Sequence, residues 1–333
     1  MDKAEDIGER KIIEIIWKHL DKDPRMAVPF GDDVSAVKYQ GKILTVLKTD
    51  MLVGKTDIPP KMSYWQAARK AVIMNISDLA AKGVKPLAIL VSLGIPRGLT
   101  RKMIVQIGKG LNAGAREYGG YVIGGDTNET EDLIISIAAM GMAEEGSLIL
   151  RNGASPGEIV ATTREFGLTS AGLRILKEKL AAPMKMRKRM LDAVLVPHAR
   201  LREGLALAKT SAVTASVDSS DGLAWSLHEI SQASNLGIEI ENPPIARETY
   251  DFARKHNLNS LELSLYGGEE YELVVTIKPS LWEKARDAVT RVGGKLIRIG
   301  KTVEKKGIFL QKKGKLVKIE ARGYEHFVAE RKN

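Results

Sequence analysis

The sequence predicts an α/β protein of two domains, and three observations lead to this expectation. The chain has 333 residues, which is long for a single hydrophobic core. Short apolar segments typical of strands alternate with segments of helical periodicity. A polar turn with glycine and proline, residues 151–157, divides the chain. We therefore expect an N-terminal α/β domain over residues 1–150 and a C-terminal α/β domain over residues 151–333.

Composition narrows the class of protein. Apolar residues make up 44% and charged residues 28% of the chain, as in ordinary globular proteins. No apolar run approaches the ~18 residues that a membrane span needs. The N-terminus lacks the basic and apolar regions of a secretory signal, so we expect a cytoplasmic protein without a membrane partner. The absence of cysteine excludes disulfides, thiolate catalysis and zinc-thiolate sites.

The net charge of +10 is compatible with nucleic acid, an acidic membrane surface or polyanionic small molecules as partners. The densest basic stretches are residues 185–189 and 301–318. Aromatic residues are only 5% of the chain and hardly interleave with these lysines, so platforms for stacking nucleotide bases are not evident. A solvated basic face is the favoured interpretation, and a basic nucleic-acid-binding protein remains an alternative.

The first half begins with an amphipathic helix and continues with strands and helices in alternation. Ile12, Ile13, Ile16 and Leu20 lie on one face of the first helix. The expected elements are a helix over residues 8–20, a strand over 42–48, a helix over 63–83, a strand over 86–93, a helix over 100–118 and strands over 121–123 and 133–142.

The second half continues the same alternation. A strand over 212–217 leads into an acidic turn, and strands over 301–318 are separated by lysine-rich turns. The other expected elements are strands over 158–163, 237–241, 272–277 and 295–299, and helices over 170–179, 200–209, 223–234 and 280–292.

The helix over residues 63–83 is the element around which the other predictions are arranged. Ser63 and Gln66 form the pattern of a capping box at its start, and Gly83 is a natural stop. The helix is otherwise apolar, yet it carries Asp78 near its end and Asn75 one turn earlier. The helix dipole disfavours an anion at that end, so Asp78 points to a functional role.

Four further acidic segments follow expected strands or loops: residues 32–33, 49–50, 124–127 and 218–221. Each of them alone is also typical of a turn or a helix N-cap. Together they would repel one another strongly without cations, and magnesium prefers such oxygen ligands. We therefore expect them to converge on a nucleoside triphosphate and more than one magnesium ion.

Familiar catalytic motifs are missing from the sequence. There is no Gly-x-x-x-x-Gly-Lys-Ser/Thr phosphate loop and no His-Arg-Asp loop of protein kinases. The five histidines are scattered and lack the spacing of metal ligands. A nucleophilic triad is therefore unsupported.

The order and spacing of six motifs resemble the thiamine-monophosphate kinase family, part of the aminoimidazole ribonucleotide synthetase-like superfamily. The resemblance extends from about residue 8 to residue 327. The motifs are Gly31-Asp32-Asp33, Thr49-Asp50-Met51-Leu52-Val53, Asn75-Ile76-Ser77-Asp78-Leu79-Ala80-Ala81-Lys82-Gly83, Gly124-Gly125-Asp126-Thr127, Asp218-Ser219-Ser220-Asp221-Gly222-Leu223 and Gly267-Gly268-Glu269-Glu270-Tyr271-Glu272-Leu273.

This resemblance implies a two-domain α/β fold whose N-terminal domains pair in a homodimer, and ATP-dependent phosphorylation of thiamine monophosphate to thiamine diphosphate. It implies magnesium ligands at Asp33, Thr49, Asp50, Asp78, Asp126, Asp218 and Asp221, and nucleotide contacts from Gly125, Asp126, Arg151 and Ser220. Asp78, Asp126 and Arg151 would act in catalysis, and Glu269 and Tyr324 would contact the thiamine.

The expected chemistry fits these residues, because a phosphate acceptor is already ionised and needs no general base. Metal ions and Arg151 would instead bring two polyanions together. Taken singly, Glu269 is also compatible with a solvated turn, and Tyr324 with a core tyrosine. The chain departs from the family pattern at Asp57, which takes the place of a substrate-side histidine, and at Glu270, where aspartate is frequent.

Other members of the superfamily are the nearest alternatives. The hydrogenase-maturation ATPase and selenophosphate synthetase typically use a cysteine or selenocysteine, and this chain has no cysteine. Aminoimidazole ribonucleotide synthetase remains as the alternative enzyme.

Overall fold

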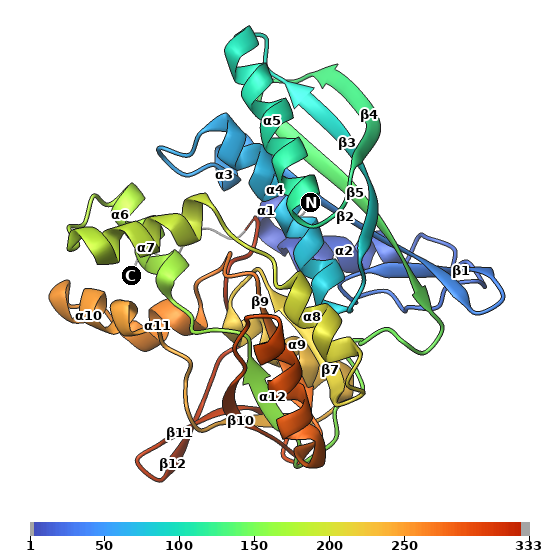
Figure 1. Ribbon diagram of the computed structural model, residues 1–333. Coiled ribbons are helices and arrows are strands. Elements are labelled where there is room, and N and C mark those ends of the chain that lie inside the picture. Colours follow the sequence, from blue (N-terminus) through green and yellow to red (C-terminus); the bar gives the residue numbers. More distant parts are fainter. Residues whose placement is uncertain (1–2, 328–333) are drawn as a thin grey trace.

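The computed structural model describes residues 3–327, and its first half is built on a five-stranded sheet (Figure 1). In spatial order the strands are β1 (Ser35–Gln40), β2 (Ile43–Val53), β5 (Ile134–Glu144), β3 (Pro86–Ile95) and β4 (Val122–Glu129). Only β3 and β4 are parallel, and the other neighbours are antiparallel. Three short helices, α1 (Ala4–Ile7), α2 (Glu9–Trp17) and α3 (Gly54–Asp57), accompany the first strands.

Helix α4 (Tyr64–Ala81) is buried along most of its length between the two halves of the molecule. It packs against α5 (Arg101–Glu117) and the inner face of the first sheet. The expected capping box is present, with Gln66 N donating to Ser63 Oγ at 3.2 Å. The chain leaves the helix at Gly83, whose φ of 69° suits glycine. The prediction of this helix and of its cap is confirmed.

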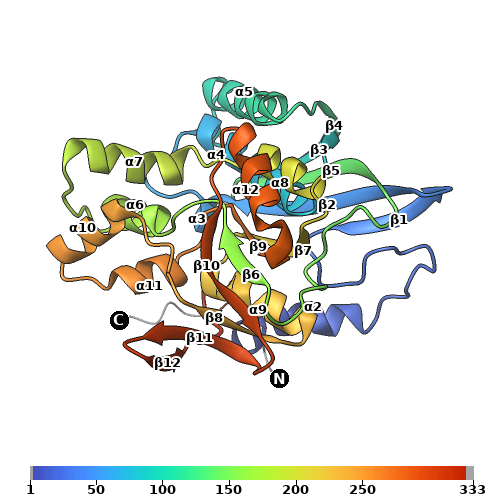
Figure 2. The ribbon, with the colours of Figure 1, turned by 60° about the horizontal axis from the view of Figure 1, so that its bottom comes forward.

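The second half contains a seven-stranded sheet. Its strands in spatial order are β12 (Lys315–Lys318), β11 (Gly307–Lys312), β8 (Gly237–Ile240), β10 (Ile297–Val303), β6 (Ile159–Thr162), β9 (Glu272–Ile277) and β7 (Val213–Ser219). Around it lie α6 (Leu168–Lys177), α7 (Met184–Leu195), α8 (Leu201–Ala208), α9 (Leu223–Ser234), α10 (Arg247–Lys255), α11 (Ser260–Leu265) and α12 (Trp282–Arg291) (Figure 2). The α/β class is confirmed in both halves.

The two halves share one hydrophobic core. Buried residues of α4, such as Leu79, belong to the same apolar cluster as Leu207 of α8 and Val275 of β9. Helices α4 and α8 come so close that a Cβ on Gly204 would lie 2.0 Å from the carbonyl oxygen of Ala80. Residue 150 lies in the segment of the chain that joins β5 of the first sheet to β6 of the second. The exact domain boundary within this segment stays a prediction.

Two strands are longer than the sequence pattern predicts. Strand β2 continues to Val53, and β4 continues to Glu129, so Asp50 and Asp126 lie within strands and not at their ends. The two glycines that suggested a turn are part of β4. A Cβ on Gly125 would lie 1.8 Å from the carbonyl oxygen of Val91, so glycine is needed there for close strand pairing.

Several elements lie in segments where none was expected: α1, β1, α3, α7, α10 and α11. Helix α7 contains the basic stretch 185–189, whose charges hide a helical pattern that buries only Met190 and Val194. None of the described helices is long and apolar enough to cross a bilayer.

Candidate active site

Three buried carboxylates meet at the junction of the two halves. Oxygen atoms of Asp33, Asp78 and Asp218 all lie within 4.8 Å of one another. Asp33 comes from the loop before β1, Asp78 from the last turn of α4 and Asp218 from the end of β7. Segments distant in the sequence therefore converge, as the acidic motifs predict.

Neighbouring polar side chains hold this cluster in place. Ser77 Oγ donates to Asp218 Oδ2 at 2.7 Å, so that α4 is tied to β7. The side-chain oxygen of Asn75 accepts a hydrogen bond of 2.9 Å from the backbone N–H of Asp50. Asn75 and Ser77 of α4 thus hold strand β2 and the second sheet in fixed positions relative to Asp78.

Three cationic side chains contact the carboxylates. Lys48 Nζ lies 3.1 Å from both Asp50 Oδ1 and Asp78 Oδ2. Lys82 Nζ lies 2.6 Å from Asp32 Oδ1 and 2.8 Å from Asp33 Oδ2. The sequence interpretation did not include either lysine in the site. Their occurrence within apolar segments is the signal that could have revealed them.

Arg151 is the third cation, and it reaches the cluster from the connection between the halves. Its Nε donates to Asp33 Oδ1 at 2.6 Å, and its Nη1 lies 3.3 Å from Glu229 Oε1. The predicted nucleotide contact at this position therefore lies directly beside a predicted metal ligand.

Burial and mutual repulsion change the acidity of the carboxyl groups. Burial raises the pKa of Asp78 well above its usual value, and the neighbouring carboxylates of Asp218 and Asp50 add to the increase. Burial likewise raises the pKa of Asp218 to about 7, with a contribution from Asp33. Burial also acts on Asp33, but Lys82 and Arg151 outweigh it, so the pKa of Asp33 lies below its usual value.

The donor set fits a hard divalent cation. All three clustered side chains offer carboxylate oxygens, the ligands that magnesium prefers. Asp33 Oδ2 is buried and takes part in no aligned hydrogen bond, although the Lys82 ammonium is near it. The Lys82 ammonium therefore meets this oxygen as a cation and not as an aligned donor, so the fit to magnesium rests on the three clustered carboxylates.

The segment after β7 connects the cluster to Glu269 and Tyr324, the two residues expected to contact the acceptor. Burial raises the pKa of Asp221 to about 7, together with the carboxylates of Glu229 and Glu9. Asp221 does not cap α9, whose N-cap is Gly222 without a side-chain bond. The carbonyl oxygen of Ser220 accepts from the backbone N–H of Glu269 at 2.5 Å, and that of Asp221 accepts from Tyr324 N–H at 3.0 Å.

The residues expected on the acceptor side gather around Lys70. The buried ammonium of Lys70 pairs with the carboxylate of Glu269 and donates to the carbonyl oxygen of Asp57 at 2.9 Å. The Asp57 carboxylate accepts from Val53 N–H at 2.7 Å. Burial raises the pKa of Tyr324 to about 12, and the nearby carboxylates of Asp57 and Glu269 contribute. Glu270 does not belong to this group of residues around Lys70, since its side chain accepts a hydrogen bond of 2.6 Å from the backbone N–H of Gly167.

Three predicted residues lie apart from the cluster within one chain. Asp126 and Gly125 are exposed on the edge strand β4. Thr49 alternates with Asp50 along β2, so its side chain points to the outer face of the sheet, and its hydroxyl donates to the carbonyl oxygen of Ile137 at 2.9 Å. Their expected roles in binding metal and nucleotide stay predictions.

Family models and individual relatives match the chain over nearly its whole length. Residues 31–143 match the N-terminal domain and residues 153–313 the C-terminal domain of the AIR synthase related proteins. The thiamine-monophosphate kinase of Nitrosopumilus maritimus is 33% identical over 96% of this chain and 99% of its own length. That of Pyrococcus horikoshii is 34% identical over 96% of both chains. This chain belongs to the thiamine-monophosphate kinase family.

Solved structures agree with the family assignment. The structure of AaThiL complexed with AMPPCP and TMP superimposes with a TM-score of 0.85 at 27% identity, over 98% of this chain and 99% of that chain. The thiamine monophosphate kinase of Aquifex aeolicus gives a TM-score of 0.78 at 26% identity, over 92% and 97%. The two-domain architecture expected of a thiamine-monophosphate kinase is confirmed.

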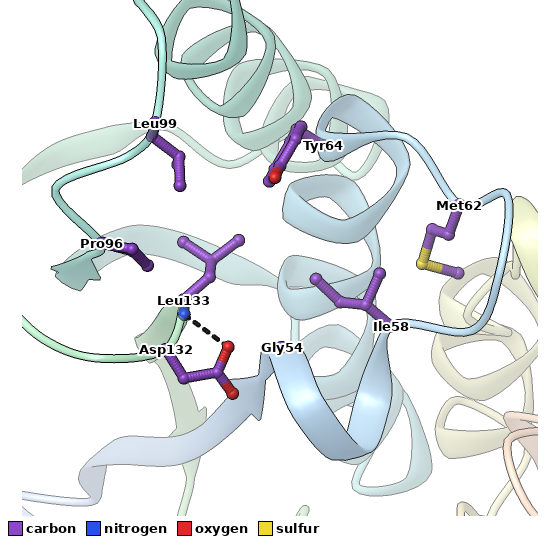
Figure 3. Close-up of a pocket in the computed structure, with 8 residues that line it drawn as sticks. All are labelled: Gly54, Ile58, Met62, Tyr64, Pro96, Leu99, Asp132 and Leu133. Carbon is purple, nitrogen blue, oxygen red and sulfur yellow. Dashed lines mark hydrogen bonds between the residues drawn. The ribbon is translucent and has the colours of Figure 1, made fainter.

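A pocket of about 300 Å³ is lined by residues of α3, of the start of α4 and of the loops that follow β3 and precede β5 (Figure 3). Ile58, Tyr64, Leu99 and Leu133 are among the residues that line it. Its one carboxylate, Asp132, accepts hydrogen bonds from the backbone N–H groups of Leu133 and Lys55. None of the residues expected to bind metal, nucleotide or acceptor in this kinase family lines the pocket.

Proposed function

We propose that this chain transfers the γ-phosphoryl group of ATP to thiamine monophosphate, with magnesium ions held by the carboxylates at the junction of its halves. Asp33, Asp78 and Asp218 form the core of the metal site, and Asp50 and Asp221 complete it. Asp126 and Thr49, whose side chains lie apart from the cluster within one chain, are further proposed ligands. The observation that carries the proposal is the convergence of three buried carboxylates, with oxygens within 4.8 Å of one another, in a chain of this family.

The chain's own residues supply binding and orientation. The acceptor phosphate is already ionised, so no side chain has to remove a proton from it. Arg151 has a side chain that is 21% exposed and anchored by Asp33, so its guanidinium can contact a phosphate without moving far. Glu269, Asp57 and Tyr324 surround the position proposed for the thiamine. Bound magnesium would neutralise the phosphates and align them for in-line displacement.

The decisive experiment is an acceptor assay. The purified protein is incubated with ATP and magnesium together with thiamine monophosphate, thiamine or formylglycinamidine ribonucleotide, and the products are separated by chromatography. Formation of thiamine diphosphate with thiamine monophosphate alone is the expected result. Turnover only with the purine precursor would favour aminoimidazole ribonucleotide synthetase activity instead.

We also propose that the protein is a homodimer that pairs through the outer face of its first sheet. This face carries exposed Leu47, Met51, Leu90 and Met142, and the edge strand β4 beside it is exposed along its whole length. An apolar face next to an unpaired strand favours association with another chain.

The position of Asp126 gives this dimer a catalytic role. Across the sheet, Asp50 of β2 pairs with Ile137 of β5, and Val91 of β3 pairs both with Ile137 and with Gly125 of β4. Three strand spacings, about 14 Å in total, therefore separate β2 from β4. Asp50 and Asp126 of one chain are therefore too far apart to share an ion. We propose that Asp126 completes the site of the partner chain.

Two other expectations have simple tests. A basic nucleic-acid-binding protein would retain single- or double-stranded nucleic acid in a salt-dependent manner even with saturating ATP, and we expect no such retention. Cytoplasmic location stays a prediction, to be checked by cell fractionation.

A further inference from the structure

Lys82 is a buried cation at the edge of the acidic cluster, and the mechanism above gives it no task. It follows α4 as its C-cap residue, and its side chain has no exposed surface. Its ammonium meets three oxygens: Asp32 Oδ1 at 2.6 Å, Asp33 Oδ2 at 2.8 Å and the carbonyl oxygen of Ser216, to which it donates at 2.7 Å. The contact with Ser216 is a hydrogen bond, and the contacts with the two carboxylates are buried ion pairs.

Three oxygens around one positive charge are also what a metal ion would find at this position. Asp32 and Asp33 supply two carboxylate oxygens and Ser216 a carbonyl oxygen, all of them hard ligands. We propose that the Lys82 ammonium is a permanent substitute for a divalent cation at Asp32 and Asp33, and that it reduces the number of metal ions that the site must bind. This inference rests on the proposed metal site.

The contrast with Lys48 supports a permanent role for Lys82. The Lys48 side chain is 18% exposed and has two carboxylate contacts at 3.1 Å, so it can turn toward solvent when an ion approaches Asp50 and Asp78. The Lys82 side chain is 0% exposed and is enclosed by α4, the 32–33 loop and β7. An ion cannot displace Lys82 without opening the contact between the two halves.

The formal charges agree with a reduced metal requirement. With every carboxyl group ionised, the six carboxylates of Asp32, Asp33, Asp50, Asp78, Asp218 and Glu229 face the four cations of Arg10, Lys48, Lys82 and Arg151. This leaves two negative charges, which a single divalent ion balances before nucleotide binds. Loss of Lys82 would leave Asp32 and Asp33 with an unpaired buried charge that favours one more ion.

The test counts metal ions and does not use turnover. Mn²⁺ is titrated into the nucleotide-free protein, and the free ion is followed by electron paramagnetic resonance. Lys82→Met keeps most of the length of the side chain and removes its charge, and we expect it to bind one more Mn²⁺ per chain than the wild type. Lys85→Met removes an exposed positive charge three residues away, and it should bind the same number as the wild type.

Thermal unfolding gives a second measurement. Without metal, Lys82→Met should unfold at a temperature several degrees lower than the wild type, and Mn²⁺ should restore most of the loss. The proposal is overturned if Lys82→Met binds the same number of ions as the wild type and Mn²⁺ does not restore its stability. Lys82 would then only stabilise the fold.

A second variant keeps the proposal testable if Lys82→Met does not fold. Asp32→Asn in the otherwise native chain should bind as many Mn²⁺ ions as the wild type, because Lys82 already occupies Asp32. A count lower by one would make Asp32 a metal ligand and contradict the proposal. Thiamine diphosphate formation is measured separately, so failure of the ion count and failure of the proposed reaction are distinguishable.

Discussion

Asp78 is the carboxylate whose position is hardest to explain without a metal ion. It is buried at the end of α4, where the helix dipole disfavours an anion, and it lies beside Asp33 and Asp218. We expect Asp78→Asn to lower kcat by roughly 100-fold or more, because a ligand charge is lost while the shape is kept. Steady-state assays at saturating magnesium measure this. Asp192→Asn, on the exposed face of α7, is the control, and near-normal turnover of Asp78→Asn would remove Asp78 from the ligands.

Asp218 gives the site a dependence on pH. Its pKa of about 7, raised by burial, means that metal must displace a proton below neutrality. We expect the magnesium concentration for half-maximal activity to fall as the pH rises from 6 to 8. In the metal-free protein, the folded-state pKa exceeds the unfolded value of ~3.9, so Asp218 stabilises the fold at low pH and this contribution is lost between about pH 4 and 7.

The difference between the wild type and Asp218→Asn isolates this group. Thermal unfolding in EDTA is measured for both proteins from pH 4.5 to 8. The wild type should lose stability relative to the variant as the pH rises, and magnesium should reverse the loss. Parallel pH curves for the two proteins would show that Asp218 does not titrate in this range.

At the scale of elements, the turn before β9 is held in an unusual conformation. Glu269 and Tyr271 have φ values of 64° and 52°, although neither is glycine. Backbone strain of this kind persists where the surroundings fix it. The buried ammonium of Lys70 on α4 binds the Glu269 carboxylate and the carbonyl oxygen of Asp57, so α4 positions both segments of the proposed acceptor site.

Removal of the Lys70 ammonium should therefore weaken binding of the acceptor more than binding of the nucleotide. We expect Lys70→Met to raise KM for thiamine monophosphate about tenfold and to leave KM for ATP nearly unchanged, because the lost contact orients the acceptor side alone. Lys55→Met, on the exposed part of α3, should change neither constant. Equal increases in both KM values would indicate a general loss of structure.

The elements also show what the sequence can and cannot predict. Helix α4 was predictable because its cap, its apolar periodicity and its terminal glycine are all local signals. The position of Asp50 within β2 was not, because the length of a strand depends on its partner β5, about 90 residues further on. Lys48 and Lys82 were missed for the same reason, since Asp78, which contacts Lys48, and Asp32, which contacts Lys82, come from other segments.

For the whole molecule, the site lies where the two halves meet. Helix α4 belongs to the first sheet, packs on the second and places Asp78 between Asp33 and Asp218. The motifs predicted this convergence because each supplies a carboxylate. They did not predict that Asp126 lies on the outer edge of the same sheet, because face and distance depend on strand register.

Mixed dimers test whether Asp126 acts on the partner chain. Asp78→Asn and Asp126→Asn homodimers should each be nearly inactive. A dimer with one chain of each kind has one site in which Asp78 of one chain and Asp126 of the other are both intact, and a second site that lacks both. If equal amounts of the two variants are unfolded and refolded together, half of the dimers are mixed. One of the two sites in each mixed dimer is intact, so about a quarter of wild-type activity should return. If each site takes both residues from a single chain, every site carries one substitution and the mixture stays inactive.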